Sequence, residues 1–346
     1  MAPRLLLAVL LLAAAASAGA ADASAALPDE AKVCLACHGT ESAPKVDASA
    51  FAKSVHNPLG CTGCHAGVDP AKHPGAAKPE RVSCAGCHAD STKHYQASVH
   101  AAQREKGNEG APACATCHTP HEVSAAAVGE GLKDACLGCH AAAVETHQKW
   151  LPNTARHLEV VSCAACHAPS VQRKVDLRLH DGIAKKRVSE ELVPGFGDQV
   201  KKLDKDGKGL DPSQLRTLLA HVEQEGKVIQ PVLIGRIEIR NGAESHQLAG
   251  KASAVKDCQR CHRAGAEPFQ SVTLSVLGTD GKTLRYDAQK EVLSSPTSVE
   301  SVRGFYAIGG TRIGLLDVLL ALALLAGISA PLAHLALRKL LRKKQG

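Results

Sequence analysis

Seven copies of one five-residue pattern constrain this chain more than any other feature. In each copy two residues separate a pair of cysteines, and a histidine follows the second cysteine at once; the copies begin at Cys34, Cys61, Cys84, Cys114, Cys136, Cys163 and Cys258. The copies use all 14 cysteines of the 346-residue chain. Any fold must therefore place seven identical chemical units, six of them within residues 34–167.

This spacing is that of haem c attachment. Two cysteines two residues apart form thioether bonds to one edge of the macrocycle, and the next residue, histidine, binds the iron from one face. A dithiol redox pair, half of a zinc site or a set of disulfides also uses paired cysteines. None of these alternatives explains a histidine after every second cysteine, so we predict seven covalently attached haem c groups.

The predicted attachment residues are therefore the two cysteines and the histidine of every copy. The thioether cysteines are Cys34, Cys37, Cys61, Cys64, Cys84, Cys87, Cys114, Cys117, Cys136, Cys139, Cys163, Cys166, Cys258 and Cys261. The proximal iron ligands are His38, His65, His88, His118, His140, His167 and His262.

Histidine is also the expected second axial ligand of each iron. The only methionine is Met1, which leaves with an N-terminal signal peptide, and two histidine ligands hold iron at a lower potential than histidine with methionine. A histidine just before a motif is expected to reach a neighbouring haem rather than the one that follows it. The distal candidates are His56, His73, His100, His121, His147, His157 and His246, with His94 in reserve.

The composition agrees with a haem-filled interior. Only 2% of the residues are aromatic, a poor supply of the rings that normally dominate burial. We predict a mostly α-helical and irregular multihaem fold, with a core of stacked haems and little regular secondary structure. It also carries a small α/β insert and one C-terminal transmembrane helix.

The insert is predicted from a stretch without cysteine. LDPSQLRTLLAHVEQEG reads as an amphipathic helix with Asp211 as its N-cap and Gly226 at its end, and VIQPVLIGRIEIRNG reads as a strand. Further on, apolar stretches flank Asp280 and Gly281, which indicates a hairpin.

Both ends of the chain carry apolar segments. Arg4 precedes a short apolar run and small residues, as in a secretory signal peptide. The apolar stretch near the C-terminus is long enough to span a bilayer, and the basic residues after it predict a cytoplasmic tail. The bulk of the chain is then periplasmic, anchored in the cytoplasmic membrane by one span. Much of the net charge of +7 falls in the tail, which leaves no basic surface for nucleic acid.

The predicted organisation follows from these features. Its parts are a signal peptide (1–20), a hexahaem domain (21–170), the haem-free α/β insert (171–250), the seventh haem with the hairpin (251–312), the transmembrane helix (313–337) and the basic cytoplasmic tail (338–346).

The motif array resembles periplasmic multihaem c-type cytochromes of the cytochrome c3-like and NrfH/c554-like superfamily. The S-V-H phrases at His56 and His100 are similar to the distal-ligand segments of that group. The C-terminal anchor, with FYAIGGTRI before it, resembles heptahaem subunits that pair with a cytochrome b of the hydrogenase or formate dehydrogenase type. This resemblance implies a membrane cytochrome b, or another quinol-oxidising subunit, as one partner and a periplasmic redox protein as the other.

The resemblance thus implies electron transfer between quinol and periplasmic acceptors in anaerobic respiration, with the chain as an electron-transfer subunit rather than a catalytic one. The alternative is a multihaem reductase of a small nitrogen or sulfur oxyanion, which needs one iron with an open distal face. A passive electron store is a third reading. An electron store would need no quinol partner, so co-purification of a cytochrome b distinguishes the electron-transfer subunit from the store.

Overall fold

The structure is a computed structural model that describes most of the chain. The described residues are 26–40, 44–73, 75, 80–123, 129–225, 227–279, 282–295, 302–303 and 314–342. The predicted signal peptide, the predicted helix end at Gly226, the hairpin turn at Asp280 and Gly281 and the FYAIGGTRI stretch lie outside them. The chain forms two compact units, Met1–Glu80 and Arg81–Gly346.

The first unit is built around two short helices. It contains α1 (Asp29–His38), α2 (Ala48–Ala52) and the 3-10 turn η1 (Asn57–Leu59). Asp47 caps α2 by accepting hydrogen bonds from the amides of Ser49 and Ala50, as expected of aspartate at this position. Phe51 is the one large side chain buried among the described residues of this unit.

The second unit begins with short helices that carry the motifs or lie between them. These are η2 (Cys84–Gly86), α3 (Ala89–Gln96), α4 (Val99–Glu105), α5 (Cys114–Cys117), α6 (Gly129–Cys139), α7 (Ala143–Gln148), α8 (Thr154–Val160) and α9 (Cys163–His167). The remaining motif begins on the 3-10 turn η4 (Cys258–Arg260). Two further 3-10 turns, η3 (Gly242–His246) and η5 (Glu267–Phe269), precede and follow it. Most motifs therefore lie on single helical turns with loops between them.

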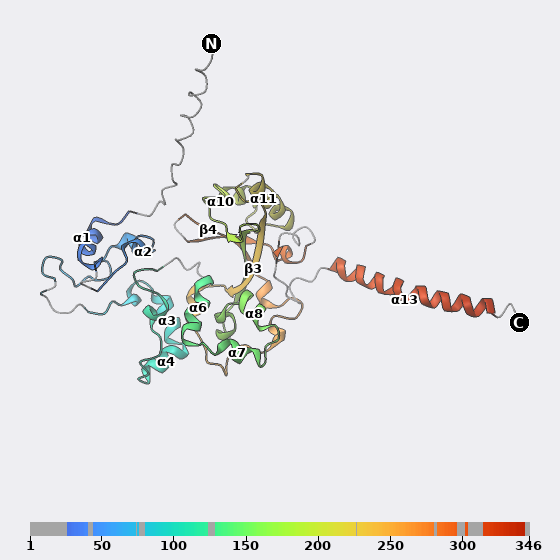
Figure 1. Cartoon of the computed structure of the whole chain (residues 1–346), viewed down its shortest axis with the longest axis horizontal. Helices are drawn as coiled ribbons and strands as arrows, with labels where there is room; N and C mark the ends of the chain where they lie inside the picture. The colour runs from blue at the N-terminus through green and yellow to red at the C-terminus, as the bar shows by residue number, and fades with distance from the viewer. Residues whose placement is uncertain are drawn as a thin grey trace, which may run out of the picture. The chain divides into compact units, whose positions relative to one another are not determined.

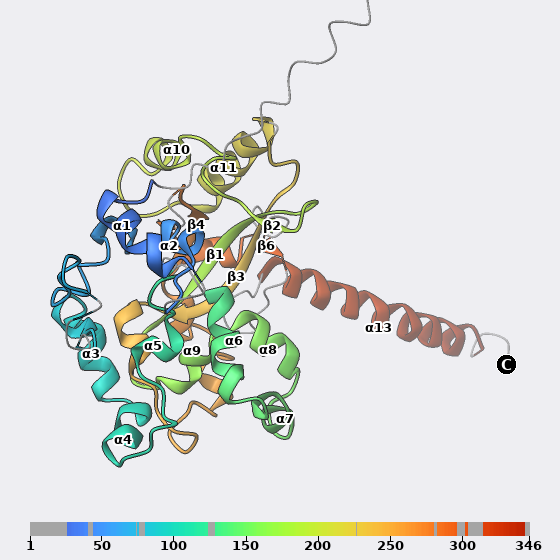
Figure 2. The same cartoon turned by 60° about the vertical axis from the view of Figure 1, so that its left-hand side comes forward.

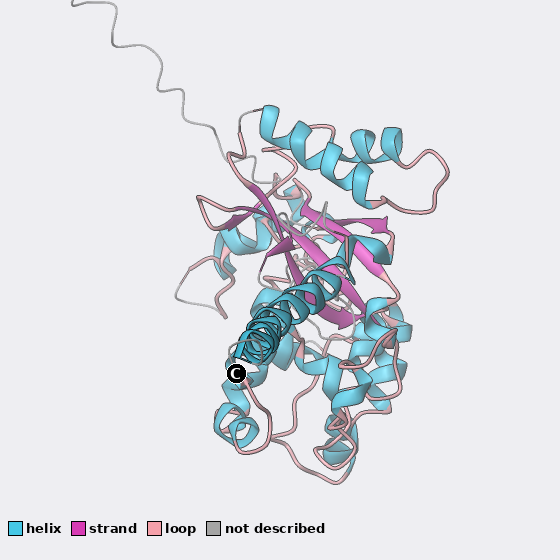
Figure 3. Cartoon of the chain, turned by 90° about the vertical axis from the view of Figure 1, so that its right-hand side faces the viewer, coloured by secondary structure: helices cyan, strands magenta, loops and turns pink. Residues whose placement is uncertain are grey.

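A mixed sheet forms the rest of the second unit. Its strands are β1 (Arg173–Asp181), β2 (Lys186–Arg187), β3 (Pro231–Ile239), β4 (Val272–Leu277), β5 (Thr283–Ala288) and β6 (Val302–Arg303), in the order β5-β4-β1-β3-β6 with β2 beside β1. β3 and β5 run antiparallel to their partners β1 and β4, whereas the β1–β4 and β3–β6 pairs are parallel. Figure 3 shows the strands side by side.

The apolar core lies between this sheet and two helices, α10 (Phe196–Leu203) and α11 (Pro212–Gln224). Alternate residues of β1, among them Val175 and Leu177, are fully buried in it together with Leu215 of α11. Figure 1 shows α10 and α11 on one side of the sheet and the helices α6 and α8 on the other. Burial of these side chains provides the main apolar stabilisation of the described second unit.

The opposite residues of β1 are charged and buried. Asp176 accepts hydrogen bonds from the hydroxyls of Thr273 at 3.0 Å and Ser275 at 3.1 Å, and it pairs with Arg178, which also pairs with Glu238. These contacts join β1 to β3 and β4, so they satisfy polar groups that would otherwise be costly to bury.

The small α/β element is confirmed, but its sheet is not confined to residues 171–250. The helix and strand expected there are α11, capped by Asp211, and β3. The expected hairpin strands are β4 and β5, which join the same sheet after the seventh motif. Segments on both sides of that motif are therefore held by one hydrogen-bonded framework.

The last helix, α13 (Gly314–Arg342), contains a stretch long and apolar enough to cross a membrane, Val318–Arg338. The side chains of this stretch are exposed, and Pro331 lies within the helix. Figure 2 shows α13 as a single long helix. Its position agrees with the span expected over residues 313–337.

Loss of the Asp211 cap should loosen the start of α11. The carboxylate accepts hydrogen bonds from the amides of Ser213 at 2.7 Å and Gln214 at 2.8 Å. Asp211→Ala removes both acceptors and should cost about 1 kcal/mol locally, which is about five-fold faster amide hydrogen exchange at these two residues. Glu223→Ala, an exposed change on the same helix, is the control. Equal exchange in the two variants would contradict the assignment of the cap.

Candidate functional site

The structure places the imidazole rings of five motif histidines beside those of histidines from other segments. Each pair joins one predicted proximal ligand to one predicted distal candidate. The ring-centre separations are 5.9 Å for His38–His73, 6.3 Å for His100–His140, 6.0 Å for His118–His246, 6.2 Å for His147–His167 and 6.0 Å for His157–His262.

These separations suit one metal ion between two imidazoles. A metal–imidazole bond is about 2 Å long and a ring centre lies about 1 Å beyond its nitrogen, so two rings on opposite sides of one iron have centres about 6 Å apart. Direct ring stacking has no need of so uniform a distance, because aromatic pairs tolerate centres from about 4.5 to 7 Å. The donor set therefore fits the iron of haem c.

Backbone hydrogen bonds leave the second ring nitrogen of several of these histidines available to a metal. The Nδ1 atom lies 2.9 Å from the carbonyl of Pro44 in His38, 2.7 Å from that of Ala143 in His147, 3.3 Å from that of Asn153 in His157, 3.4 Å from that of Ala249 in His167 and 3.0 Å from that of Ala243 in His246. A carbonyl only accepts, so Nδ1 carries the proton and the lone pair is on Nε2. This is the arrangement by which proteins orient a metal-binding imidazole.

Burial keeps several of these rings neutral. It lowers the pKa of His100, His118 and His167, and the facing ring of each pair lowers the pKa further. A protonated imidazole cannot bind iron, so the lowered pKa values favour the ligating form near neutral pH.

In every pair the partner comes from outside the motif's own neighbourhood. His100 of α4 precedes the Cys114 motif in sequence, yet it faces His140. His157 of α8 precedes the Cys163 motif and faces His262. The pairs thus connect segments that lie far apart in the chain.

The cysteines of successive motifs are neighbours in the second unit. Cys136 and Cys163 share a thiol hydrogen bond, Cys117 lies near Cys139, and Cys166 lies near Cys261. The motifs that begin at Cys114, Cys136, Cys163 and Cys258 therefore follow one another in space as they do in sequence.

The surroundings of three of these sulfur atoms are apolar enough to favour an uncharged form, whereas the hydrogen bond with Cys136 lowers the pKa of Cys163 to about 6. Burial raises the pKa of the Cys166 thiol to about 11 and also raises those of Cys117 and Cys261. A thioether carries no charge, so these environments suit covalently attached sulfur better than a reactive thiolate.

Backbone hydrogen bonds of residues 247–255 hold His246 in place beside His118. Leu248 accepts a hydrogen bond from the amide of Val99 at 2.8 Å, which ties this segment to the start of α4. The amide of Ala249 donates to the carbonyl of His167 at 2.6 Å, and that of Val255 donates to Cys166 at 2.9 Å. One extended segment thus fixes η3 beside both α4 and α9.

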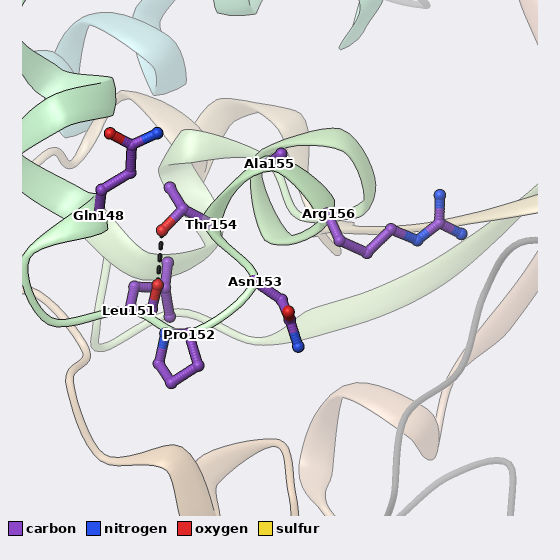
Figure 4. A pocket seen from close by; sticks show the side chains of 7 residues that line it. All are labelled: Gln148, Leu151, Pro152, Asn153, Thr154, Ala155 and Arg156. Carbon is purple, nitrogen blue, oxygen red and sulfur yellow. Dashed lines mark hydrogen bonds between the residues drawn. The ribbon is translucent and has the colours of Figure 1, made fainter.

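A tight turn between α7 and α8 places His157. Figure 4 shows the side chains that line a shallow depression at this turn, with the Thr154 hydroxyl donating to the carbonyl of Leu151 at 2.5 Å. Asn153 adopts a left-handed conformation, with φ at 51°, and its carbonyl accepts from His157. Asparagine tolerates this conformation better than most residues. The turn therefore both starts α8 and orients the ring.

In the first unit, Glu30 joins two motifs. Its carboxylate accepts hydrogen bonds from the amides of Cys61 at 2.9 Å and Thr62 at 3.0 Å, and it lies 3.8 Å from the sulfur of Cys34. A Cβ atom at Gly60 would come within 2.3 Å of this carboxylate, and Gly60 has a φ of 62°, so glycine is required there. Glu30, Cys34 and Cys61 lie close enough to share a metal ion, but the two cysteines are also the predicted haem attachment residues.

Arg173 plays a similar positioning role in the second unit. The buried guanidinium donates to the carbonyl of Ala165 at 2.6 Å and pairs with Glu267 at 3.5 Å. It therefore links α9, which carries one motif, to η5, which follows another. Sequence patterns missed both Glu30 and Arg173, because a single charged residue outside a motif carries no recognisable signature.

The other histidines lie in different settings. His56, His65, His88 and His121 each make interactions within the chain, and the assignment of His56 and His121 as distal ligands stays a prediction. His94 lies on α3. His180 on β1 contacts the carbonyl of Arg178, and His221 on α11 pairs with Glu225.

The motif-bearing helices lack an apolar core of their own. Among the described residues between 84 and 157, the buried side chains are those of Ser98, Ala101, Ala111 and Thr154. Small side chains of this kind bury too little apolar area to hold such a segment together. A large apolar group attached to each motif would supply the buried area that the side chains do not.

The comparisons with known proteins agree with this geometry. The family model described as cytochrome c554 and c-prime matches residues 83–168, a stretch that contains four of the seven motifs. This match supports a c-type multihaem cytochrome that transfers electrons, and it implies covalently bound haem c. No curated protein and no solved structure matched the chain.

Removal of one paired histidine should open one iron. His246→Ala deletes the ring that faces His118, so the oxidised, haem-loaded protein should gain one high-spin haem per chain, measured by electron paramagnetic resonance with spin counting. His221→Ala is the matched control, because His221 lies on α11 and pairs with Glu225. A new high-spin haem in the control, or none in His246→Ala, would show that the pairing is wrong.

Proposed function

We propose that this chain is a membrane-anchored heptahaem c-type cytochrome that carries electrons between a quinol-linked cytochrome b in the membrane and periplasmic acceptors. The proposal places the chain in anaerobic respiration, with haem c attached at all seven motifs. It extends the electron-transfer role that the family match supports for residues 83–168.

The observation that carries the proposal is the set of five facing histidine pairs. Haem c supplies a reversible one-electron couple when it is attached. An imidazole on each side of the iron leaves no position for a substrate, and this favours electron transfer over chemistry at the metal. By elimination, His56 and His121 are proposed to serve His65 and His88.

The spatial succession of motifs supports a continuous path. Cys136 touches Cys163, and Cys166 lies near Cys261, so groups attached at these cysteines would be neighbours along the second unit. His88 lies close enough to His118 to affect the pKa of His118. The motifs that begin at Cys84, Cys114, Cys136, Cys163 and Cys258 therefore form one row of neighbours. Electron transfer requires such short steps between neighbouring carriers, and the residues described here hold the attachment points that close.

The C-terminal helix supports the membrane part of the proposal. Val318–Arg338 is apolar enough to cross a bilayer, and Arg338 and the basic residues after it favour a cytoplasmic end. The N-terminal segment, read as a signal peptide, agrees with a periplasmic location. A cytochrome b then lies within reach of the anchored chain, and the menaquinol that it oxidises is the proposed electron donor.

Quinol-driven reduction tests this function. The full chain should co-purify with a cytochrome b, and a menaquinol analogue should reduce its haem c in proteoliposomes that contain both proteins, measured as the growth of the reduced haem c absorption band. The chain alone should be reduced much more slowly by the same quinol. Rapid turnover of nitrite, hydroxylamine or sulfite by the chain alone would instead favour a reductase.

A further inference from the structure

His262 differs from the other paired histidines in the surroundings of its second nitrogen. Its Nδ1 atom is buried and, within the described part of the chain, has no hydrogen-bond acceptor. His38, His147, His167 and His246 each have a backbone carbonyl at that position. The ring that lies opposite His262, that of His157, also has a backbone carbonyl near its Nδ1, at 3.3 Å.

The other Nδ1 atoms that lack a protein acceptor are not sealed in this way. His118 is partly desolvated, but both it and His140 retain exposed surface, so water can accept the proton of each ring. No other histidine in the described chain has a buried nitrogen without a partner. The environment of His262 is therefore unusual among these ligands.

This difference affects how strongly the ring donates to iron. An Nδ1–H group that donates to a carbonyl makes the imidazole a more basic ligand, and a more basic ligand stabilises ferric over ferrous iron. An Nδ1–H group without an acceptor leaves the ring less basic. The ferric state of the iron is then stabilised less, and the reduction potential of that iron is higher.

Nearby charges add little to this difference. The Cys261 sulfur lies near two positive groups, Arg173 and Arg260, and two negative ones, Glu267 and Asp257. Arg173 is itself buried and pairs with Glu267, so its positive charge is largely balanced.

The sheet fixes the positions of both histidines of the His157–His262 pair. His157 lies on α8, which is tied to β3 by the hydrogen bond from the Arg236 guanidinium to the carbonyl of Glu159 at 2.7 Å. His262 lies in the segment that Glu267 joins to Arg173 of β1. The sheet therefore holds both rings. The near approach of Cys166 to Cys261 places this pair next to the His147–His167 pair, at one end of the row.

We propose that the iron between His157 and His262 has the highest reduction potential in the described second unit, so that an electron entering the row settles there first. The inference rests on the proposed electron-transfer function. It identifies the iron at which electrons within the described second unit would collect. The haem-free sheet then has a role, which is to build and seal this terminal site.

A ligand exchange identifies the potential of this site. Methionine in place of a distal histidine raises the potential of that iron alone. In the full-length, haem-loaded protein, His157→Met should move the highest midpoint of a mediator-equilibrated redox titration further upward and leave the lower midpoints in place. In the matched control, His147→Met, a lower midpoint should move and the highest one of the unaltered protein should persist.

The low-spin signals followed by magnetic circular dichroism during the titration assign each midpoint. If His157→Met leaves its iron without a sixth ligand, the low-spin component that disappears should be the first to be reduced in the unaltered protein. If a component of low potential disappears instead, the proposal is wrong. Mediators replace quinol in this titration, so its outcome is independent of whether a cytochrome b is the natural donor.

Discussion

The rest of the second unit depends on one constraint, the pairing of four of its motif histidines with histidines from other segments. In the sequence, β1, β2 and β3 lie between His118 and His246, and the same three strands lie between His157 and His262. Iron held between such rings would cross-link the chain at several points. Such cross-links reduce the conformational freedom of the unfolded chain in the way that disulfides do. They would account for how helices of four to seven residues keep a defined arrangement.

The sheet supplies the rigidity that the motif-bearing helices lack. Its core contains the large apolar side chains, such as Leu177 and Phe196, whereas the helices bury mainly alanine and serine. Backbone hydrogen bonds connect this sheet to the segments that carry the predicted histidine ligands. The amide of Ser162 donates to the carbonyl of Ile237 at 2.9 Å, next to the helix that carries His157. A segment without any motif thus positions the ligands of a motif that follows it.

The sequence was sufficient for features that depend on local chemistry. The motif spacing, the lack of a second methionine, the cap at Asp211 and the strand now called β3 could each be recognised in short windows. Which histidine faces which motif could not be predicted, because contacts such as that from Val99 to Leu248 decide it and they involve ordinary backbone groups. The same reason hid Glu30 and Arg173, whose roles depend on partners distant in the chain.

The axial ligands of the fully oxidised, haem-loaded protein test the account most directly. Near-infrared magnetic circular dichroism contains a charge-transfer band whose energy identifies the two ligands of a low-spin ferric haem. The account predicts that the band of two imidazoles represents all seven irons of the chain. Bis-imidazole intensity equivalent to fewer than the five irons expected from the facing histidine pairs would contradict it.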